Sequence, residues 1–262
     1  MTQPPTQYGL PALRESDRFI AAIEDGEVVI DLVDDRPAMW LAPRAPGRYE
    51  RLVKPVVDRV VAALLLVVLS PVLLAVALAV RVVLGPGVLF RQARVGKDGV
   101  PFEVLKFRTM HPDRRERRSR HFAGPDRRRT HKTLADPRHT RLGTFLRSSS
   151  LDELPQLWNV LRGEMSLVGP RPELVEIVDQ YADWQHRRHD VKPGLTGLWQ
   201  VSERDDEGNM HLHVAIDLVY VRQVSAWTDL RLLALTIPAV LGRPVGHRTA
   251  RFPAASADAT AA

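Results

Sequence analysis

Two adjacent carboxylates, Asp152 and Glu153, lie in a polar stretch that has an arginine on each side. Arg147 comes five residues before Asp152, and Arg171 lies in a Gly-Pro-Arg-Pro sequence whose two prolines restrict the backbone around it. One interpretation is structural, because acids in the first turn of a helix complement its dipole and Asp is a favourable N-cap. The arginines favour a second interpretation, in which the carboxylates act on a phosphate-bearing substrate.

Two further cations could assist such chemistry. Lys106 and Arg108 alternate in the sequence Leu-Lys-Phe-Arg-Thr-Met, so both are expected on one face of a strand. Phosphoryl transfer needs cations, since the charge on phosphate must be neutralised before an anion attacks phosphorus. The carboxylates then have two uses that the residues alone leave open. They can hold Mg²⁺, which proteins usually bind through carboxylate oxygens together with the phosphate oxygens of a substrate. Alternatively, one carboxylate can attack phosphorus to form an acyl phosphate.

An uncharged segment of 21 residues runs from Val60 to Val80. This length allows one helix to cross ~30 Å of hydrocarbon. Pro71, near the centre, should kink the helix, and Ser70 can bond to a backbone group freed there. Both flanks are basic, which places both ends on the cytoplasmic side by the positive-inside rule. We therefore expect a re-entrant helix, with a single spanning helix as the alternative.

Lys54 and Asp58 precede this segment and are four residues apart, so they share a helix face and can form an ion pair. Such a pair is either a minor contact among lipid headgroups or a contact that anchors the segment. We expect anchoring, because an unpaired charge at a membrane boundary is costly.

The remaining patterns predict a mostly helical α+β protein with one small β-hairpin. Residues 88–96 and 101–110 are β-prone runs joined by Lys-Asp-Gly, which is a hairpin signal. Apolar residues at 229–241 fit an amphipathic interfacial helix that is too short to span a membrane. Apolar spacing elsewhere predicts helices within 142–162, over 172–190 and over 212–224, and a Gly-rich turn followed by a short strand within 192–202.

The chain has a formal net charge of +6 and a strongly basic stretch over residues 111–141. This stretch could bind nucleic acid or lie over anionic lipids. Because it follows the apolar segment, we favour anionic inner-leaflet lipids and expect no nucleic-acid partner. The absence of cysteine excludes disulfides and thiolate metal sites.

Four blocks of the chain resemble the bacterial sugar transferase family, whose small members are monotopic phosphoglycosyl transferases. The blocks occur in the family's order and cover about residues 50–245. They read KPVVDRV followed by Ser-Pro, FRQARVGKDGVPFEVLKFRTM, TRLGTFLRSSSLDELPQLWNVLRGEMSLVGPRPE and VKPGLTGLWQVS.

The resemblance implies an activity and a location. Members of this family transfer a phosphosugar from a UDP-sugar to polyprenol phosphate and release UMP, which initiates exopolysaccharide or other glycoconjugate assembly. The resemblance also implies Mg²⁺ as the cofactor and homodimers as one form to expect. It places the protein in the bacterial inner membrane, with its catalytic domain on the cytoplasmic face and a re-entrant helix broken at Ser70-Pro71.

The resemblance also implies roles for individual residues. Asp152 corresponds to the nucleophile that forms a covalent phosphosugar intermediate and contacts the metal, and Glu153 is the second catalytic carboxylate of the dyad. The substrate and phosphate ligands correspond to Lys106, Arg108, Arg147 and Arg171.

On this basis we divide the chain into four parts: a polar tail over 1–50 that largely lacks a fixed fold, a re-entrant membrane helix over 51–84, a catalytic domain over 85–245 with its basic insertion at 111–141, and a second disordered tail over 246–262. This organisation resembles the small, core-only members of the family. Glu203 stands where the family usually has glycine, which leaves the local turn open. The alternative function is a membrane-tethered basic binding protein, or a scaffold of a glycan assembly complex without catalysis.

Overall fold

The structure is a computed structural model, and it describes residues 44–111, 138, 140–202 and 214–240 together with two short paired strands, β1 (Ile23–Glu24) and β2 (Glu27–Val28). Most of the tail predicted for residues 1–50 and of the basic stretch at 111–141 lies outside these residues. So do Glu203 and the tail predicted for 246–262.

The apolar segment forms two helices, α1 (Lys54–Val68) and α2 (Ser70–Leu84), which meet at a bend of 64°. Pro71 lacks an N–H group and its ring excludes a helical bond to the carbonyl oxygen of Val67, four residues earlier. The hydroxyl of Ser70 donates to that oxygen at 2.8 Å, so the freed acceptor is satisfied. Within the described residues, no single helix is long and apolar enough to cross a membrane, whereas this bent pair is sufficient by length and composition.

The predicted hairpin is confirmed as β3 (Leu89–Val95) and β4 (Pro101–Phe107), which pair antiparallel. The Lys-Asp-Gly turn uses left-handed backbone at Asp98 and Gly99, which lets the chain reverse tightly. A second, parallel pair of strands joins β5 (Ser166–Val168) to β6 (Gly194–Thr196).

The rest of the described chain is mostly helical, so the predicted α+β class is confirmed. One local prediction was wrong and another was correct only in part. The helix expected over 172–190 is divided into one short helix and a 3₁₀ segment, because the backbone of Ala182 between them is extended. The short strand expected within 192–202 is β6, but it ends before residues 198–202, which form a helix with Leu198 and Val201 buried one turn apart. The elements are α4 (Arg141–Ser148), η5 (Leu151–Glu153), α5 (Gln156–Arg162), α6 (Val175–Val178), η6 (Asp183–Asp190), α7 (Leu198–Ser202), α8 (Val214–Arg222) and α9 (Ala226–Val240).

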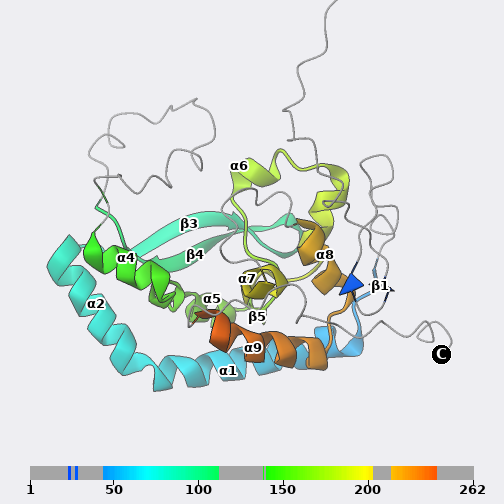
Figure 1. Ribbon diagram of the computed structural model, residues 1–262, viewed down its shortest axis with the longest axis horizontal. Helices are drawn as coiled ribbons and strands as arrows, with labels where there is room; N and C mark the ends of the chain where they lie inside the picture. The colour runs from blue at the N-terminus through cyan, green and yellow to red at the C-terminus, as the bar shows by residue number, and fades with distance from the viewer. Residues whose placement is uncertain are drawn as a thin grey trace, which may run out of the picture.

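Two clusters of apolar side chains join the bent pair to the rest of the fold. Ala62 of α1 packs with residues of α5, β5, α8 and α9, while Val80 of α2 packs with Phe107 of β4 and Leu146 of α4. Figure 1 shows α1 and α2 as a bent arm along the edge of the molecule, with α9 beside α1 and α4 beside α2. The outer faces of the arm expose apolar side chains such as Leu64 and Leu78.

Candidate active site

The two carboxylates lie in a sharp connection between two helices. After α4 the backbone of Ser150 adopts the left-handed conformation, with φ 57° and ψ 14°, and the 3₁₀ turn η5 then carries Asp152 and Glu153. The next helix, α5, has Pro155 at its N-cap position and no side-chain capping bond. Asp152 is therefore not the N-cap of α5, although it lies with Glu153 in the first turn of the 3₁₀ segment η5.

Ser150 holds a conformation that costs a residue with a side chain about 1–2 kcal/mol. Strained backbone of this kind is concentrated at functional sites, where surrounding contacts maintain it. Here it redirects the chain immediately before the carboxylate pair, so that Asp152 faces the protein interior with only 7% of its surface exposed.

Glu153 lies between two cations. Its Oε1 atom accepts hydrogen bonds from Lys106 Nζ at 2.7 Å and from Arg171 Nη2 at 3.0 Å. Burial alone would raise the pKa of Glu153, but the charges of Arg171 and Lys106 outweigh burial and hold this pKa well below its usual range. Glu153 is therefore ionised at neutral pH, and its charge is balanced by the two cations.

Asp152 has a different environment although it is the next residue. Burial, followed by the negative charge of Glu153, raises the pKa of Asp152 to about 6, and the charges of Lys106 and Arg171 only partly oppose this. Two neighbouring carboxylates whose pKa values are pushed apart are typical of a catalytic pair. At neutral pH the Asp152 carboxylate is charged, buried and incompletely neutralised, which favours binding of a cation or attack on an electrophile.

A small cleft lies beside the dyad, and Lys106, Glu153, Arg171 and a further cation, Arg94, line it. Arg94 was not predicted as a site residue from the sequence. The sequence contained the information to predict it, because the turn centred on Asp98 pairs residue 90 with residue 106 and residue 94 with residue 102. Residues 90 and 94 are an even number of positions apart on β3, so they lie on the same face as Lys106. Arg94 therefore shares a hairpin face with Lys106.

Arg108 and Arg147, the other two predicted phosphate ligands, lie at the ends of elements next to the dyad. Arg108 follows the last residue of β4, and its Nη2 atom donates to the carbonyl oxygens of Leu84 at 2.7 Å and Gly85 at 3.0 Å. This contact caps the C-terminal end of α2. Arg147 lies in the last turn of α4 and is half-buried. Phosphate binding by these two arginines stays a prediction.

Asn159 fixes the distance between the dyad and the strand that carries Lys106. Its Oδ1 atom accepts from the backbone N–H of Leu105 at 3.1 Å, and its Nδ2 atom donates to the carbonyl oxygen of Glu103 at 2.7 Å. The same amide nitrogen donates to Glu164 at 2.7 Å. Asn159 is buried on α5, so it joins the helix after the dyad directly to β4.

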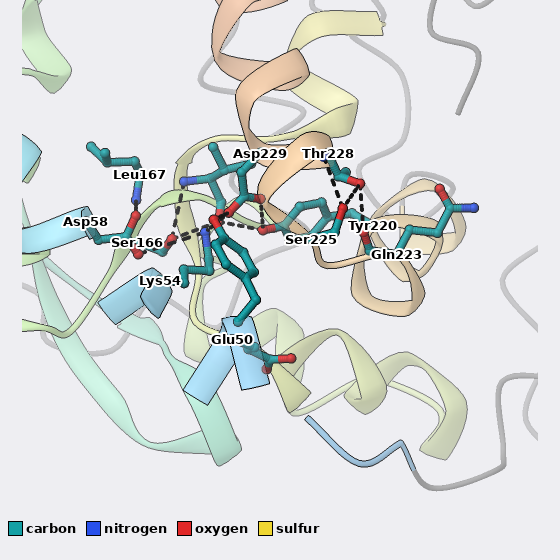
Figure 2. Close-up of polar contacts among 12 residues, drawn as sticks. Glu50, Lys54, Asp58, Ser166, Leu167, Tyr220, Gln223, Ser225, Thr228 and Asp229 are labelled. Carbon is teal, nitrogen blue, oxygen red and sulfur yellow. Dashed lines mark hydrogen bonds and ion pairs between the residues drawn. The ribbon is translucent and has the colours of Figure 1, made fainter. Parts of the chain in front are cut away.

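Lys54 and Asp58 are buried inside the protein, which excludes the alternative of an exposed pair among lipid headgroups. The anchoring role expected for them stays a prediction. Lys54 Nζ is 3.9 Å from Asp58 but 2.5 Å from Asp229 of α9. Tyr220 donates to the other oxygen of Asp229 at 2.8 Å, and Asp58 accepts from the backbone N–H of Leu167 (Figure 2). The start of α1 is thus joined to β5, α8 and α9 by a buried polar network.

The family model for bacterial sugar transferases matches residues 49–243. The chain belongs to the bacterial sugar transferase family. The match includes the bent helix pair, the hairpin, the dyad and the Gly-Pro-Arg-Pro loop, so the elements that form the cleft all lie within the matched range.

Three relatives are each 43% identical to this chain. The UDP-glucose:undecaprenyl-phosphate glucose-1-phosphate transferase of Escherichia coli (strain K12) matches over 71% of this chain and 40% of its own length. The protein of the same name from Caulobacter vibrioides matches over 72% and 69%, respectively. The exopolysaccharide production protein ExoY of Sinorhizobium fredii matches over 70% and 83%. The chain thus spans less than half the length of the first relative.

The described residues offer few ligands for a metal. Among the residues that the structure describes, no group of three or more His, Cys, Asp or Glu side chains could hold an ion. Mg²⁺ is commonly held by one or two carboxylates together with substrate phosphates and water. One oxygen of Glu153 is occupied by two cations, whereas Asp152 is incompletely neutralised. The residues therefore fit Mg²⁺ held by Asp152 with ligands supplied by a substrate.

Proposed function

We propose that this protein transfers a phosphosugar from a UDP-sugar to polyprenol phosphate and releases UMP. The observation that carries the proposal is the contrast between Asp152, which is buried and incompletely neutralised, and Glu153, which is paired with Lys106 and Arg171 beside the cleft. Membership of the family and the printed names of the relatives support the same reaction.

The cations would bind and orient the diphosphate of the donor. Lys106 and Arg171 keep 20% and 30% of their side-chain surfaces exposed, so a phosphate oxygen can reach them without displacing Glu153. The planar guanidinium of Arg171 can bind two phosphate oxygens at once. Negative charge on the phosphates is thereby reduced, which permits attack by the Asp152 carboxylate.

The transfer then takes place in two steps, the second of which regenerates the Asp152 carboxylate. An oxygen of Asp152 attacks the sugar-bearing phosphorus, a P–O bond forms, and the bond to UMP breaks with its electron pair leaving on UMP. An oxygen of polyprenol phosphate attacks the same phosphorus and displaces Asp152, which gives polyprenyl-diphosphosugar. Mg²⁺, when bound, supplies positive charge to the diphosphate. Glu153 is the poorer nucleophile, because its Oε1 atom is held by two cations.

The acceptor is a lipid, and the bent pair provides a route to it. Both arms of the 64° bend expose apolar side chains, and the ends of the pair carry basic residues. We place α1 and α2 in the cytoplasmic leaflet of the bacterial inner membrane as a re-entrant pair, with the catalytic domain on the cytoplasmic face. Exposed Phe145 of α4 and Trp227 of α9 would contact the same interface.

The test is UMP release by purified protein in detergent with Mg²⁺, undecaprenyl phosphate and a panel of UDP-sugars headed by UDP-glucose. We expect release with at least one donor, and Asp152→Asn should abolish it without loss of membrane association. Asp183→Asn, at an exposed aspartate of η6, is the matched control and should retain full activity. Turnover by Asp152→Asn near the wild-type rate would refute the nucleophilic role.

The covalent step has its own test. With donor and Mg²⁺ but no acceptor, mass spectrometry of the intact protein should detect the addition of one phosphosugar, located on the peptide that contains Asp152. Addition of undecaprenyl phosphate should remove it. A protein that releases UMP only when both substrates are present, and never carries the added mass, would refute the two-step reaction.

A further inference from the structure

The loop that carries Arg171 is held by two other arginines. Nη2 of Arg188, from η6, donates to the carbonyl oxygen of Arg171 at 2.8 Å. Nη1 of Arg94, from β3, donates to the carbonyl oxygen of Pro172 at 3.2 Å. Two consecutive carbonyl groups of the Gly-Pro-Arg-Pro loop are therefore bound by guanidinium groups from separate elements of the fold.

Each of these arginines is held in turn by a buried acid. Arg188 pairs with Asp217 of α8 at 2.5 Å, and both side chains are only 4% exposed. The other terminal nitrogen of Arg188 donates to the hydroxyl of Tyr181 at 2.6 Å. Arg94 pairs with Glu173 at 3.4 Å, and Glu173 is 1% exposed. Neither guanidinium can change its direction without breaking its ion pair with a buried acid.

The backbone of the loop has little freedom of its own. The N–H of Gly169 donates to the carbonyl oxygen of Thr196, and the N–H of Gly194 donates to the carbonyl oxygen of Pro170. A Cβ atom on Gly169 would lie 2.3 Å from the carbonyl oxygen of Lys192, so no larger residue fits there. The direction of the Arg171 side chain is consequently set by a backbone that is fixed at several consecutive residues.

Stability does not explain this arrangement by itself. A buried ion pair seldom stabilises a protein more than well-packed apolar residues of similar volume, because desolvation offsets the attraction. Arg188 instead provides geometry, since its planar fork reaches Asp217, Tyr181 and the carbonyl oxygen of Arg171 simultaneously.

We infer that Arg188 is a positioning residue, which holds the backbone of Arg171 so that the Arg171 side chain meets both Glu153 and the donor diphosphate. The inference rests on the proposed function. Arg188 itself touches no reacting atom. Its contribution to catalysis is the direction of Arg171, which reaches Glu153 at 3.0 Å.

The test is a double substitution, Arg188→Met with Asp217→Leu. Removal of Arg188 alone would break the ion pair of buried Asp217 and destabilise the protein, whereas the double substitution removes both charges and preserves apolar volume. The matched control is Arg187→Met with Asp190→Leu, which removes the half-exposed ion pair of the neighbouring residues on the same element. Arg188→Lys is a second variant, which keeps the charge opposite Asp217 but lacks the planar fork.

Two readouts separate positioning from folding. Thermal unfolding should show the double variant and the control folded to a similar extent. We expect kcat for the UDP-sugar to fall about 100-fold in the double variant, as for a misplacement of about 1 Å, and to change little in the control. Calorimetric affinity for UDP, measured without acceptor or turnover, should fall about 10-fold in the double variant, since one phosphate contact is weakened. For Arg188→Lys, both kcat and the affinity for UDP should lie between those of the double variant and those of the wild type.

Three outcomes have definite meanings. A folded double variant with wild-type kcat and wild-type UDP affinity overturns the inference. Equal UDP affinity in the wild type, Arg188→Lys and the double variant, including no detectable binding in any of them, also overturns it. Wild-type protein that binds UDP but turns over no UDP-sugar refutes the proposed function, and in that case a selective loss of UDP binding in the Arg188 variants still supports positioning.

Discussion

Replacing Asp152 with Asn should stabilise the protein at neutral pH although it removes a side chain from the site. In the fold the pKa of Asp152 is raised from 3.8 to about 6, first by burial and then by the charge of Glu153. A shift of one pKa unit corresponds to about 1.4 kcal/mol, so ionised Asp152 costs the native state about 3 kcal/mol above pH 7. Asn carries no charge and avoids that cost.

The sign and the pH window follow from linkage. A group whose pKa is higher in the folded protein binds protons more tightly there, so its contribution to stability is complete below pH 3.8 and is lost as pH rises through about 6. The advantage of Asp152→Asn should therefore be about 3 kcal/mol at pH 7.5 and should shrink to about 1 kcal/mol at pH 4.5.

Urea unfolding in detergent with EDTA, followed by tryptophan fluorescence, measures this difference at the two pH values. The control is Asp183→Asn, an exposed aspartate whose replacement should change stability by less than about 0.5 kcal/mol. Destabilisation of Asp152→Asn at pH 7.5, or an advantage of equal size at both pH values, would refute the electrostatic argument.

Three further predictions concern the same region. The rate constant kcat/KM for the donor should fall as pH drops below about 6, because the Asp152 nucleophile must be ionised. If Asp152 binds the metal, added Mg²⁺ should shift this acid limb of the pH–rate profile to lower pH. A pH–rate series with and without Mg²⁺ checks both. Ser150→Gly should raise the free energy of unfolding by up to about 1 kcal/mol in a urea titration, since Gly adopts positive φ without strain, and no gain would contradict the assigned backbone conformation. Asn159→Ala should lower the same quantity by about 2–3 kcal/mol, because it leaves the N–H of Leu105 and the carbonyl of Glu103 without their partner, and an unchanged urea midpoint would contradict this.

Local signals accounted for much of the fold. The Lys-Asp-Gly turn predicted the hairpin. Placing the centre of the turn at Asp98 also gives the correct pairing of the residues on the two strands. Pro71 predicted the kink, and the proximity of Ser70 to the freed carbonyl followed from helix geometry. These features depend on residues within a few positions of one another, where backbone sterics decide the outcome.

Long-range partners were harder to predict, because one sequence does not reveal which elements meet. Lys54 has a carboxylate one turn away in Asp58, yet its short contact is with Asp229 in the last described helix. Arg188 lies in a stretch whose apolar period predicts one continuous helix, and its buried contact with Asp217 accompanies a break in that helix. In both cases a buried charge needs a particular partner, and this requirement outweighs local preference.

The contact between Lys54 and Asp229 also has a consequence for the order of events during synthesis. The two residues are 175 positions apart, so at about 5–20 residues per second the ribosome makes Asp229 roughly 10–35 s after Lys54. During this interval Asp58, one turn along the same helix, is the carboxylate that the nascent chain offers to Lys54. The start of α1 therefore gains its short ion pair only after α9 has been synthesised, and a chain that stops before residue 229 lacks this contact.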